Sequence, residues 1–177
     1  RLTFHIAPRK PLPSNGTIWK TTRGWDSKME TIYSAWINAM FQNSTEQTSW
    51  KALHEVTQDS ERNFLYNYLS LDEDDSKSKV FVKMEPDCAD NPYFMRAYFA
   101  WKLGLPFGYH LCDRGYLGKN PQTGQWITNA SQSSKTNTVQ SFNNFIRRIA
   151  DGVHSGSART ALANENADYY PVTLSRR

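Results

Sequence analysis

The chain has 177 residues, which fits one domain with one core, and 14% of them are aromatic. Its net charge is only +4, and the basic residues are scattered, which indicates a solvated surface and argues against a nucleic-acid partner. No apolar run is long enough to cross a bilayer, and two cysteines are too few to build a disulfide scaffold.

The first 26 residues are rich in chain-breaking residues, including Pro8, Pro11, Pro13 and Gly16. Such a composition is typical of irregular, extended backbone. We therefore expect residues 1–26 to form an extended arm that wraps a single domain formed by residues 27–177.

Helical patterns begin at Ser27, which we expect to be an N-cap because Glu30 follows at capping-box spacing. Apolar residues at helical spacing then predict a helix from Lys28 to Phe41. Further patterns predict a second helix near Ser49 and a third after Ser60. The apolar residues expected on these two helices are Trp50, Leu53, Val56, Phe64, Leu65, Tyr68 and Leu69.

The segment from Leu71 to Lys79 is acidic and serine-rich, which predicts a surface loop. Val80 to Val82 is a short β-branched and aromatic run that predicts a strand or an extended entry. Pro86 then stops regular structure just before Cys88.

A central helix is predicted from about Ala89 to Leu103, because Pro92 is tolerated only near a helix start and Gly104 is a typical C-terminal stop. One stripe of this helix recurs at i, i+3, i+4 and i+7, which indicates a buried face. Its members are Phe94, Ala97, Tyr98 and Trp101.

The remaining elements are short. Patterns predict a strand from Phe107 to Cys112, an extended piece at Trp126, a helix from Val139 to Ala150 and an extended tail from Tyr169 to Leu174. Helices followed by a few strands indicate an α+β fold.

Cys88 is the strongest candidate for chemistry. A thiol in the first turn of a helix feels the positive end of the helix dipole and can be held as thiolate, whereas the neighbouring Asp87 and Asp90 oppose that charge. Two alternatives remain open from the sequence: Cys88 is a buried structural residue, or it is bridged to Cys112.

A cysteine nucleophile needs a base, and His154 is the best placed of the four histidines, since it follows the last predicted helix. The loop from Gly152 to Thr160 is small and polar and could line a site. The alternative is that His154 is an ordinary loop residue or contacts substrate. The backbone N–H groups of Cys88 and Ala89 are the expected oxyanion donors.

Metal and cofactor motifs are missing from the sequence. It has no Cys-x-x-Cys pair, no His-x-x-x-His and no glycine-rich phosphate loop. We therefore expect neither a metal nor a cofactor.

The stretch Asp87-Cys88-Ala89-Asp90, together with the helix from Tyr93 to Lys102 and Leu105-Pro106-Phe107, resembles a bacterial envelope group related to the NlpC-type cysteine peptidases. The resemblance implies a papain-like fold, with helices packed on a small antiparallel sheet. It also implies that Cys88 is the nucleophile of a thiol hydrolase that cleaves amide bonds, such as those of cell-wall peptides.

The resemblance further implies a periplasmic or secreted protein, and the start at Arg1 without methionine leaves an exported origin open. The chain departs from the family pattern, since Ala89-Asp90 stands where Ser-Gly is common. In the family the base histidine begins a strand after an entry similar to the segment from Tyr170 to Leu174. We therefore expect that further C-terminal strands, or a second chain, complete the sheet.

A different class of function also fits the sequence. The chain could be an envelope binding module that keeps the fold without a working base, with Trp19, Trp25 and Trp126 contacting glycan or peptide. A purely structural or assembly protein is a third reading.

Overall fold

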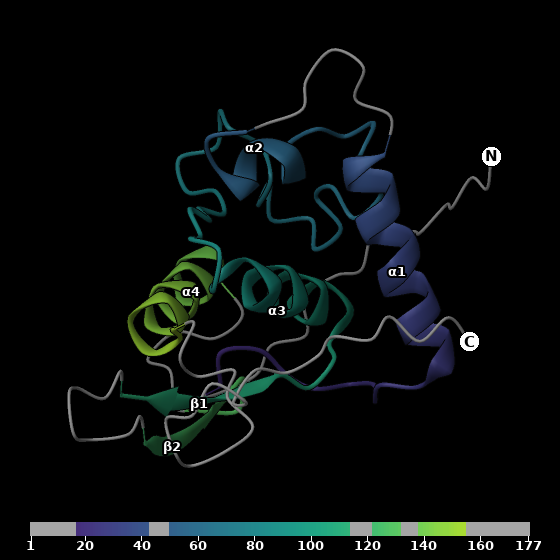
Figure 1. Cartoon of the computed structure of the whole chain (residues 1–177). Helices are drawn as coiled ribbons and strands as arrows, with labels where there is room; N and C mark the ends of the chain where they lie inside the picture. The colour runs from purple at the N-terminus through teal and green to yellow at the C-terminus, as the bar shows by residue number, and fades with distance from the viewer. Residues whose placement is uncertain (1–16, 43–49, 114–121, 132–137, 155–177) are drawn as a thin grey trace.

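The computed structural model describes residues 17–42, 50–113, 122–131 and 138–154. These residues form four α-helices and a two-stranded antiparallel sheet, which confirms the α+β class. Helix α3 lies at the centre, with α4 beside it, α1 on its other side and the sheet below (Figure 1).

Helix α1 spans Ser27–Phe41. Its cap is Asp26, not Ser27 as expected, because the Asp26 carboxylate accepts a hydrogen bond from the Met29 N–H at 2.8 Å. A carboxylate at this position also faces the positive end of the helix dipole. The predicted end of the helix at Phe41 is confirmed.

The chain between α1 and α3 is less regular than its apolar pattern suggested. Helix α2 is short, Leu53–Thr57, and leaves Trp50 outside it. The third helix expected after Ser60 is wrong, since residues 60–70 form turns. Asn67 and Ser70 adopt positive φ angles of 47° and 57°, which a continuous right-handed helix excludes.

The acidic segment after these turns is only partly the surface loop that was predicted, since Lys77 and Lys79 are exposed but Glu73 and Asp74 are 0% and 1% exposed. Lys102 of α3, also 0% exposed, forms ion pairs with both carboxylates. We call Glu73, Asp74 and Lys102 the buried charge cluster. These ion pairs hold the acidic segment against α3, because a buried carboxylate needs a charged or hydrogen-bonding partner.

Backbone amides and the Tyr98 hydroxyl also donate hydrogen bonds to the carboxylate oxygens of the buried charge cluster. Glu73 accepts hydrogen bonds from the Leu69 and Leu71 N–H groups at 2.8 and 3.0 Å. Asn67 and Asp74 exchange two backbone-to-side-chain hydrogen bonds of 2.8 Å each. This pairing explains the positive φ of Asn67, since a left-handed turn brings the two residues together.

Helix α3 spans Asn91–Leu103 and ends at Gly104, whose φ of 67° is left-handed, as the sequence predicted. The helix begins two residues later than expected. The predicted apolar stripe is buried, and so is most of the remaining surface of the helix. A helix buried on nearly every side from Ala97 to Leu103 is a core helix.

Strand β1, Gly108–Cys112, pairs with β2, Thr123–Thr128, which confirms the two predicted extended pieces. Tyr109 and Ile127 are opposite each other and buried, whereas the next pair, His110 and Trp126, points to solvent. This alternation is the ordinary two-residue period of a sheet with one covered face. Val80, Phe81 and Val82 belong to neither strand, so the strand alternative for this run is wrong, whereas the other alternative, an extended entry, stays a prediction.

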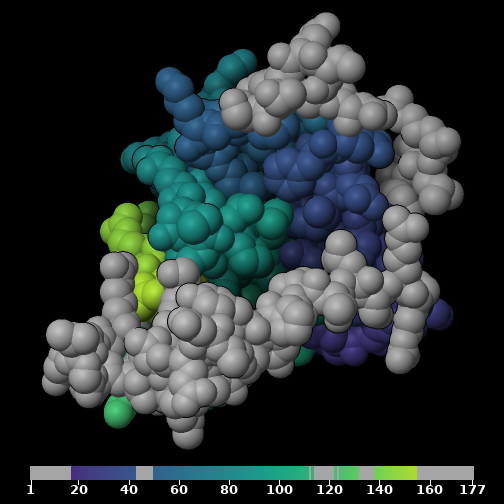
Figure 2. Space-filling view, viewed as in Figure 1, coloured from purple at the N-terminus to yellow at the C-terminus, as the bar shows by residue number. Residues whose placement is uncertain are grey.

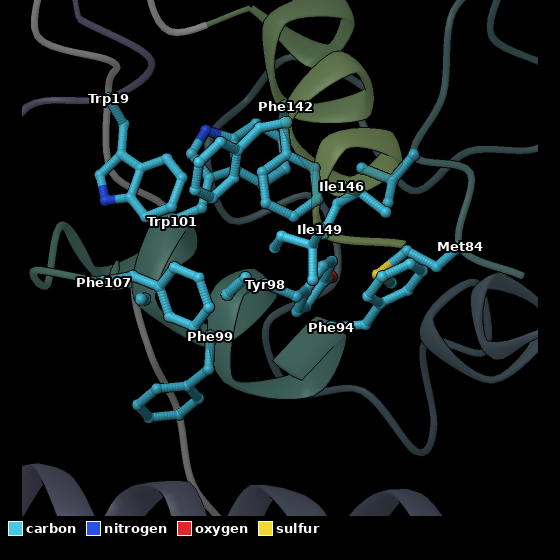
Figure 3. Close-up of a cluster of buried hydrophobic side chains, with 14 of the residues drawn as sticks. Trp19, Met84, Phe94, Tyr98, Phe99, Trp101, Phe107, Phe142, Ile146 and Ile149 are labelled. Carbon is cyan, nitrogen blue, oxygen red and sulfur yellow. The ribbon is translucent and has the colours of Figure 1, made fainter. Parts of the chain in front are cut away.

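Helix α4, Val139–Gly152, confirms the last predicted helix and covers the sheet and α3 with its apolar face. The Thr138 side chain and Ser141 form a capping box at its start. Phe142 stacks on Trp101 of α3 with ring centroids 4.2 Å apart and an interplanar angle of 10° (Figure 3). This stack joins α4 to α3 at the middle of the core.

The described part of the predicted arm, residues 17–26, contacts the C-terminal end of α3. The indole Nε1 of the buried Trp19 donates to the Leu105 carbonyl at 2.8 Å, and the Thr22 and Arg23 N–H groups both donate to the Gly104 carbonyl. Residues 1–16 and the tail expected from Tyr169 to Leu174 lie outside the described residues. No helix in the described ranges is long and apolar enough to span a membrane.

Candidate active site at the start of helix α3

Cys88 lies in the turn that leads into α3, and its thiol is exposed and free. Both structural alternatives, a buried cysteine and a disulfide with Cys112, are therefore wrong. The teal part of the chain, which includes α3 and the segment before it, reaches the surface between α4 and α1 (Figure 2). A nucleophile needs such access to solvent and substrate.

Asp87 accepts the hydrogen bonds that form the turn at Cys88. Its Oδ1 accepts hydrogen bonds from the N–H groups of Ala89 at 2.7 Å and Asp90 at 3.0 Å, and its carbonyl accepts from the Asn91 N–H at 3.1 Å. These are the bonds of a side-chain cap, so the helical backbone extends back toward Cys88. The structure places Cys88 in the turn just before α3, whose first helical residue is Asn91, and not in the first helical turn as predicted.

The same hydrogen bonds bear on the predicted oxyanion donors. The Ala89 N–H already donates to the Asp87 carboxylate, so an oxyanion at this amide would have to displace a charged acceptor. The assignment of the Cys88 and Ala89 amides as oxyanion donors stays a prediction.

Asp90 is the buried carboxyl of this site, being 5% exposed. Its Oδ2 accepts a long hydrogen bond, 3.4 Å, from the Asp87 N–H, while its Oδ1 has no hydrogen-bond partner among the described residues. Burial raises the pKa of Asp90 above its ordinary value of 3.8, and the charge of Asp87 adds to the increase. The hydrogen bond from the Asp87 amide and the charge of His154 oppose it.

His154 is half-buried and follows the end of α4 by two residues. Its electrostatic effect on Asp90 means that the imidazole lies on the same side of the molecule as the start of α3. The sequence predicted that His154 is the base for Cys88. In the structure the charge of His154 instead affects the pKa of Asp90, which follows Cys88 by two residues. The pairing with Cys88 stays a prediction, and residues 155–160 of the polar loop lie outside the described residues.

Two of the other histidines have contacts elsewhere. The His54 ring Nδ1 lies 3.0 Å from the Met84 carbonyl oxygen and 3.1 Å from the Met84 amide nitrogen, which ties α2 to the segment before Cys88. His110 lies on β1 with its ring centroid 4.7 Å from that of Trp126. His5 lies outside the described residues.

The three tryptophans proposed for ligand binding differ in exposure. Trp19 is 1% exposed, so its expected contact with a ligand is wrong. Trp25 is half-buried, and its face is covered by the Arg96 guanidinium at 3.4 Å from the ring centroid. Trp126 is 54% exposed.

The described ranges contain no group of three or more His, Cys, Asp and Glu side chains placed to share a metal ion. Comparisons of the chain with protein families, with curated proteins and with solved structures found no match.

The raised pKa of Asp90 predicts a specific pH dependence. Because the folded state holds the Asp90 proton more tightly than the unfolded state, this residue lowers stability as pH rises from 3.8 through the raised value. We therefore expect wild type to gain stability relative to Asp90→Asn when the pH falls from 7 to about 4. Urea unfolding of both proteins at both pH values measures this difference in the free energy of unfolding. The contributions of the other carboxyls cancel because both proteins contain them. A constant or opposite difference contradicts the burial argument.

Proposed function

We propose that this protein is a cysteine hydrolase that cleaves amide or peptide bonds, with Cys88 as nucleophile and His154 as base. The observation that carries the proposal is an exposed, free thiol in the hydrogen-bonded turn just before a helix whose body is buried. In this proposal the positive end of the α3 dipole faces the sulfur and stabilises its negative charge once the base has taken the proton.

The reaction follows from these groups. The imidazole of His154 takes the proton from the Cys88 Sγ, and the thiolate attacks the substrate carbonyl carbon. The tetrahedral intermediate collapses to a thioester as the imidazolium gives its proton to the departing amine. Water, deprotonated by the same imidazole, then hydrolyses the thioester and releases the acid.

Asp90 supports this assignment of charges. The charge of His154 lowers the pKa of Asp90 and opposes the effect of burial, so the imidazole is close enough for its charge to act on this carboxyl. Asp90 does not touch the reacting atoms in this scheme, so its role is to stabilise the charge on His154.

The similarity of the segment around Cys88 to NlpC-type cysteine peptidases supports the substrate class. On that basis we propose a papain-like arrangement, wall peptides as substrate, and a periplasmic or secreted site of action. We also propose that further strands, from later sequence or a second chain, complete the small sheet formed by β1 and β2. If those strands carry the base, His154→Ala keeps activity in the completed protein.

The test combines labelling and turnover. In a Cys112→Ser background, iodoacetamide should alkylate Cys88 faster at neutral pH in the folded protein than in urea-unfolded protein, because only folding supplies the helix dipole. Cys88→Ala should then reduce hydrolysis of wall-derived peptides about 10⁴-fold or more. Labelling no faster than in the unfolded chain, or wild-type turnover by Cys88→Ala, contradicts the proposal.

One observation favours a second function, binding to wall glycan or peptide without hydrolysis. Trp126 is largely exposed on the open face of the sheet, and its ring lies over Gly108, where a Cβ atom would come within 2.4 Å of the indole. A fixed, exposed indole is a typical platform for the apolar face of a sugar. Equal binding to wall material by wild type and Cys88→Ala, lost in Trp126→Ala and without turnover by any of them, would establish this function instead.

A further inference from the structure

The buried charge cluster holds an amine between two carboxyl groups in the interior of the protein. We propose that the folded chain condenses the side chains of Lys102 and Asp74 into an amide, an intramolecular cross-link between α3 and the acidic segment, with Glu73 as the proton carrier. This inference is independent of the proposed hydrolase function.

The reacting groups are in contact. The Lys102 Nζ lies 2.5 Å from the Asp74 Oδ2 and is hydrogen-bonded to the Glu73 Oε1. The Nζ therefore lies next to the carboxyl carbon that it would attack, and a fixed contact of this kind replaces the encounter that a bimolecular condensation requires.

The Asp74 carboxyl is polarised from both sides. The Tyr98 hydroxyl donates to its Oδ1 at 2.8 Å, and the Asn67 N–H donates to its Oδ2 at 2.8 Å. The Asn63 Nδ2 in turn donates to the Tyr98 oxygen at 2.8 Å, which fixes the hydroxyl in this direction. Such donors stabilise the negative charge that develops on a carboxyl oxygen when an amine adds to its carbon.

The charges of the cluster also favour condensation. One ammonium and two carboxylates would leave a net negative charge in a site that is at most 1% exposed, so neutrality requires one added proton. Burial raises the pKa of Asp74, so this carboxyl binds a proton more readily than it does in water, and its protonated form is the better electrophile.

The step balances from this neutral state. The Glu73 carboxylate takes one proton from the Lys102 ammonium, and the resulting amine attacks the Cγ of the protonated Asp74. The new N–C bond forms, a C–O bond breaks, and the hydroxyl leaves as water with a second proton from the nitrogen. The products are an amide, a neutral Glu73 and one water molecule, so the site is uncharged before and after.

The surroundings keep the reactants together and keep bulk water out. The ring centroids of Tyr98 and Trp101 lie 4.9 and 5.5 Å from the Lys102 Nζ, and both rings are buried. An unreacted ion pair would account for the same contacts, so the two states have to be distinguished by covalent mass.

Intact mass spectrometry of the unfolded, purified wild-type protein makes this distinction. We expect a mass lower than that of the sequence by one water, and a protease digest should contain a branched peptide that joins Lys102 to Asp74. The full sequence mass in protein that was folded and soluble overturns the proposal. So does a water loss that maps elsewhere, such as a succinimide at Asp151-Gly152.

Two substitutions sharpen the test. Asp74→Asn should lose one ammonia instead of one water and so reach the same final mass as wild type, because the amide product is identical. Lys102→Arg keeps a cation but has no primary amine, and it should keep its full mass. Cys88→Ala should remain cross-linked, so failure of the cross-link and failure of the hydrolase are separate results.

Discussion

Replacing Lys102 with methionine should lower the free energy of unfolding by about 3–5 kcal/mol, the usual effect of removing one partner from a buried ion pair. Methionine fills a similar volume, so the loss is electrostatic. It leaves Glu73 and Asp74 buried without a cation, although their backbone hydrogen bonds remain. Where Lys102 and Asp74 are condensed as proposed above, no ion pair is left, and the substitution instead removes the covalent link and leaves the same two carboxyls without their partner. Equilibrium unfolding in urea measures the effect.

The matched control removes all three charges together. In Lys102→Met/Glu73→Gln/Asp74→Asn each amide oxygen can still accept one of the two hydrogen bonds that its carboxylate accepted, and no charge is left buried. We expect this triple variant to recover part of the stability lost in Lys102→Met. A single variant within 1 kcal/mol of wild type, or a triple variant less stable than the single one, contradicts the assignment of charge as the cause.

Replacing Trp101 with alanine should destabilise the protein by about 3–5 kcal/mol, because it removes a large side chain from the middle of the core. Trp101 is 1% exposed and stacks on Phe142, and it also packs edge-on to Tyr98 with centroids 6.5 Å apart. The cavity would lie where α3 meets α4. Thermal and urea unfolding both report this change.

Trp126→Ala is the matched control for the loss of an indole. Trp126 is 54% exposed on the sheet, so its removal should change the free energy of unfolding by only about 0.5 kcal/mol. Trp101→Phe should retain much of the stack and fall between the two. Equal effects of the Trp101 and Trp126 alanine variants would show that the core is not centred on α3.

Both predictions concern α3, the helix that begins just after Cys88. The buried charge cluster and the Trp101–Phe142 stack both fix the body of α3, and the Asp87 cap fixes its first turn. A destabilised α3 should therefore also slow the labelling of Cys88 toward the rate seen in the unfolded chain. The candidate site depends on residues far from it in the sequence.

Where local pattern and burial agree, the sequence predicted the structure well. The stripe containing Phe94 and Trp101 follows the helical period, and Gly104 supplies the left-handed residue that ends α3. Helix α4 was equally readable from the spacing of Phe142 and Ile149. In each helix the apolar residues recur at helical spacing and lie on one face, so their spacing in the sequence shows which face is buried.

For the acidic segment, the sequence did not predict which residues are buried. Glu73 and Asp74 read as surface residues because charged side chains are seldom buried, and Lys102 gave no sign of burial in a helix with an apolar stripe. The partners are separated by 28 and 29 residues, and no local pattern links them. Likewise, Asn67 pairs with Asp74 and interrupts a helix that the apolar spacing favoured.

The sequence alone determined the class of the fold, the central helix and the position of Cys88 just before it, since these depend on period, caps and chain-breaking residues. Only the tertiary structure decided that the Cys88 thiol is exposed, that Asp90 two residues later is buried, and that three charged side chains lie together in the core. Burial and charge pairing join residues from separate elements, and their energies depend on distance in space, not on order along the chain.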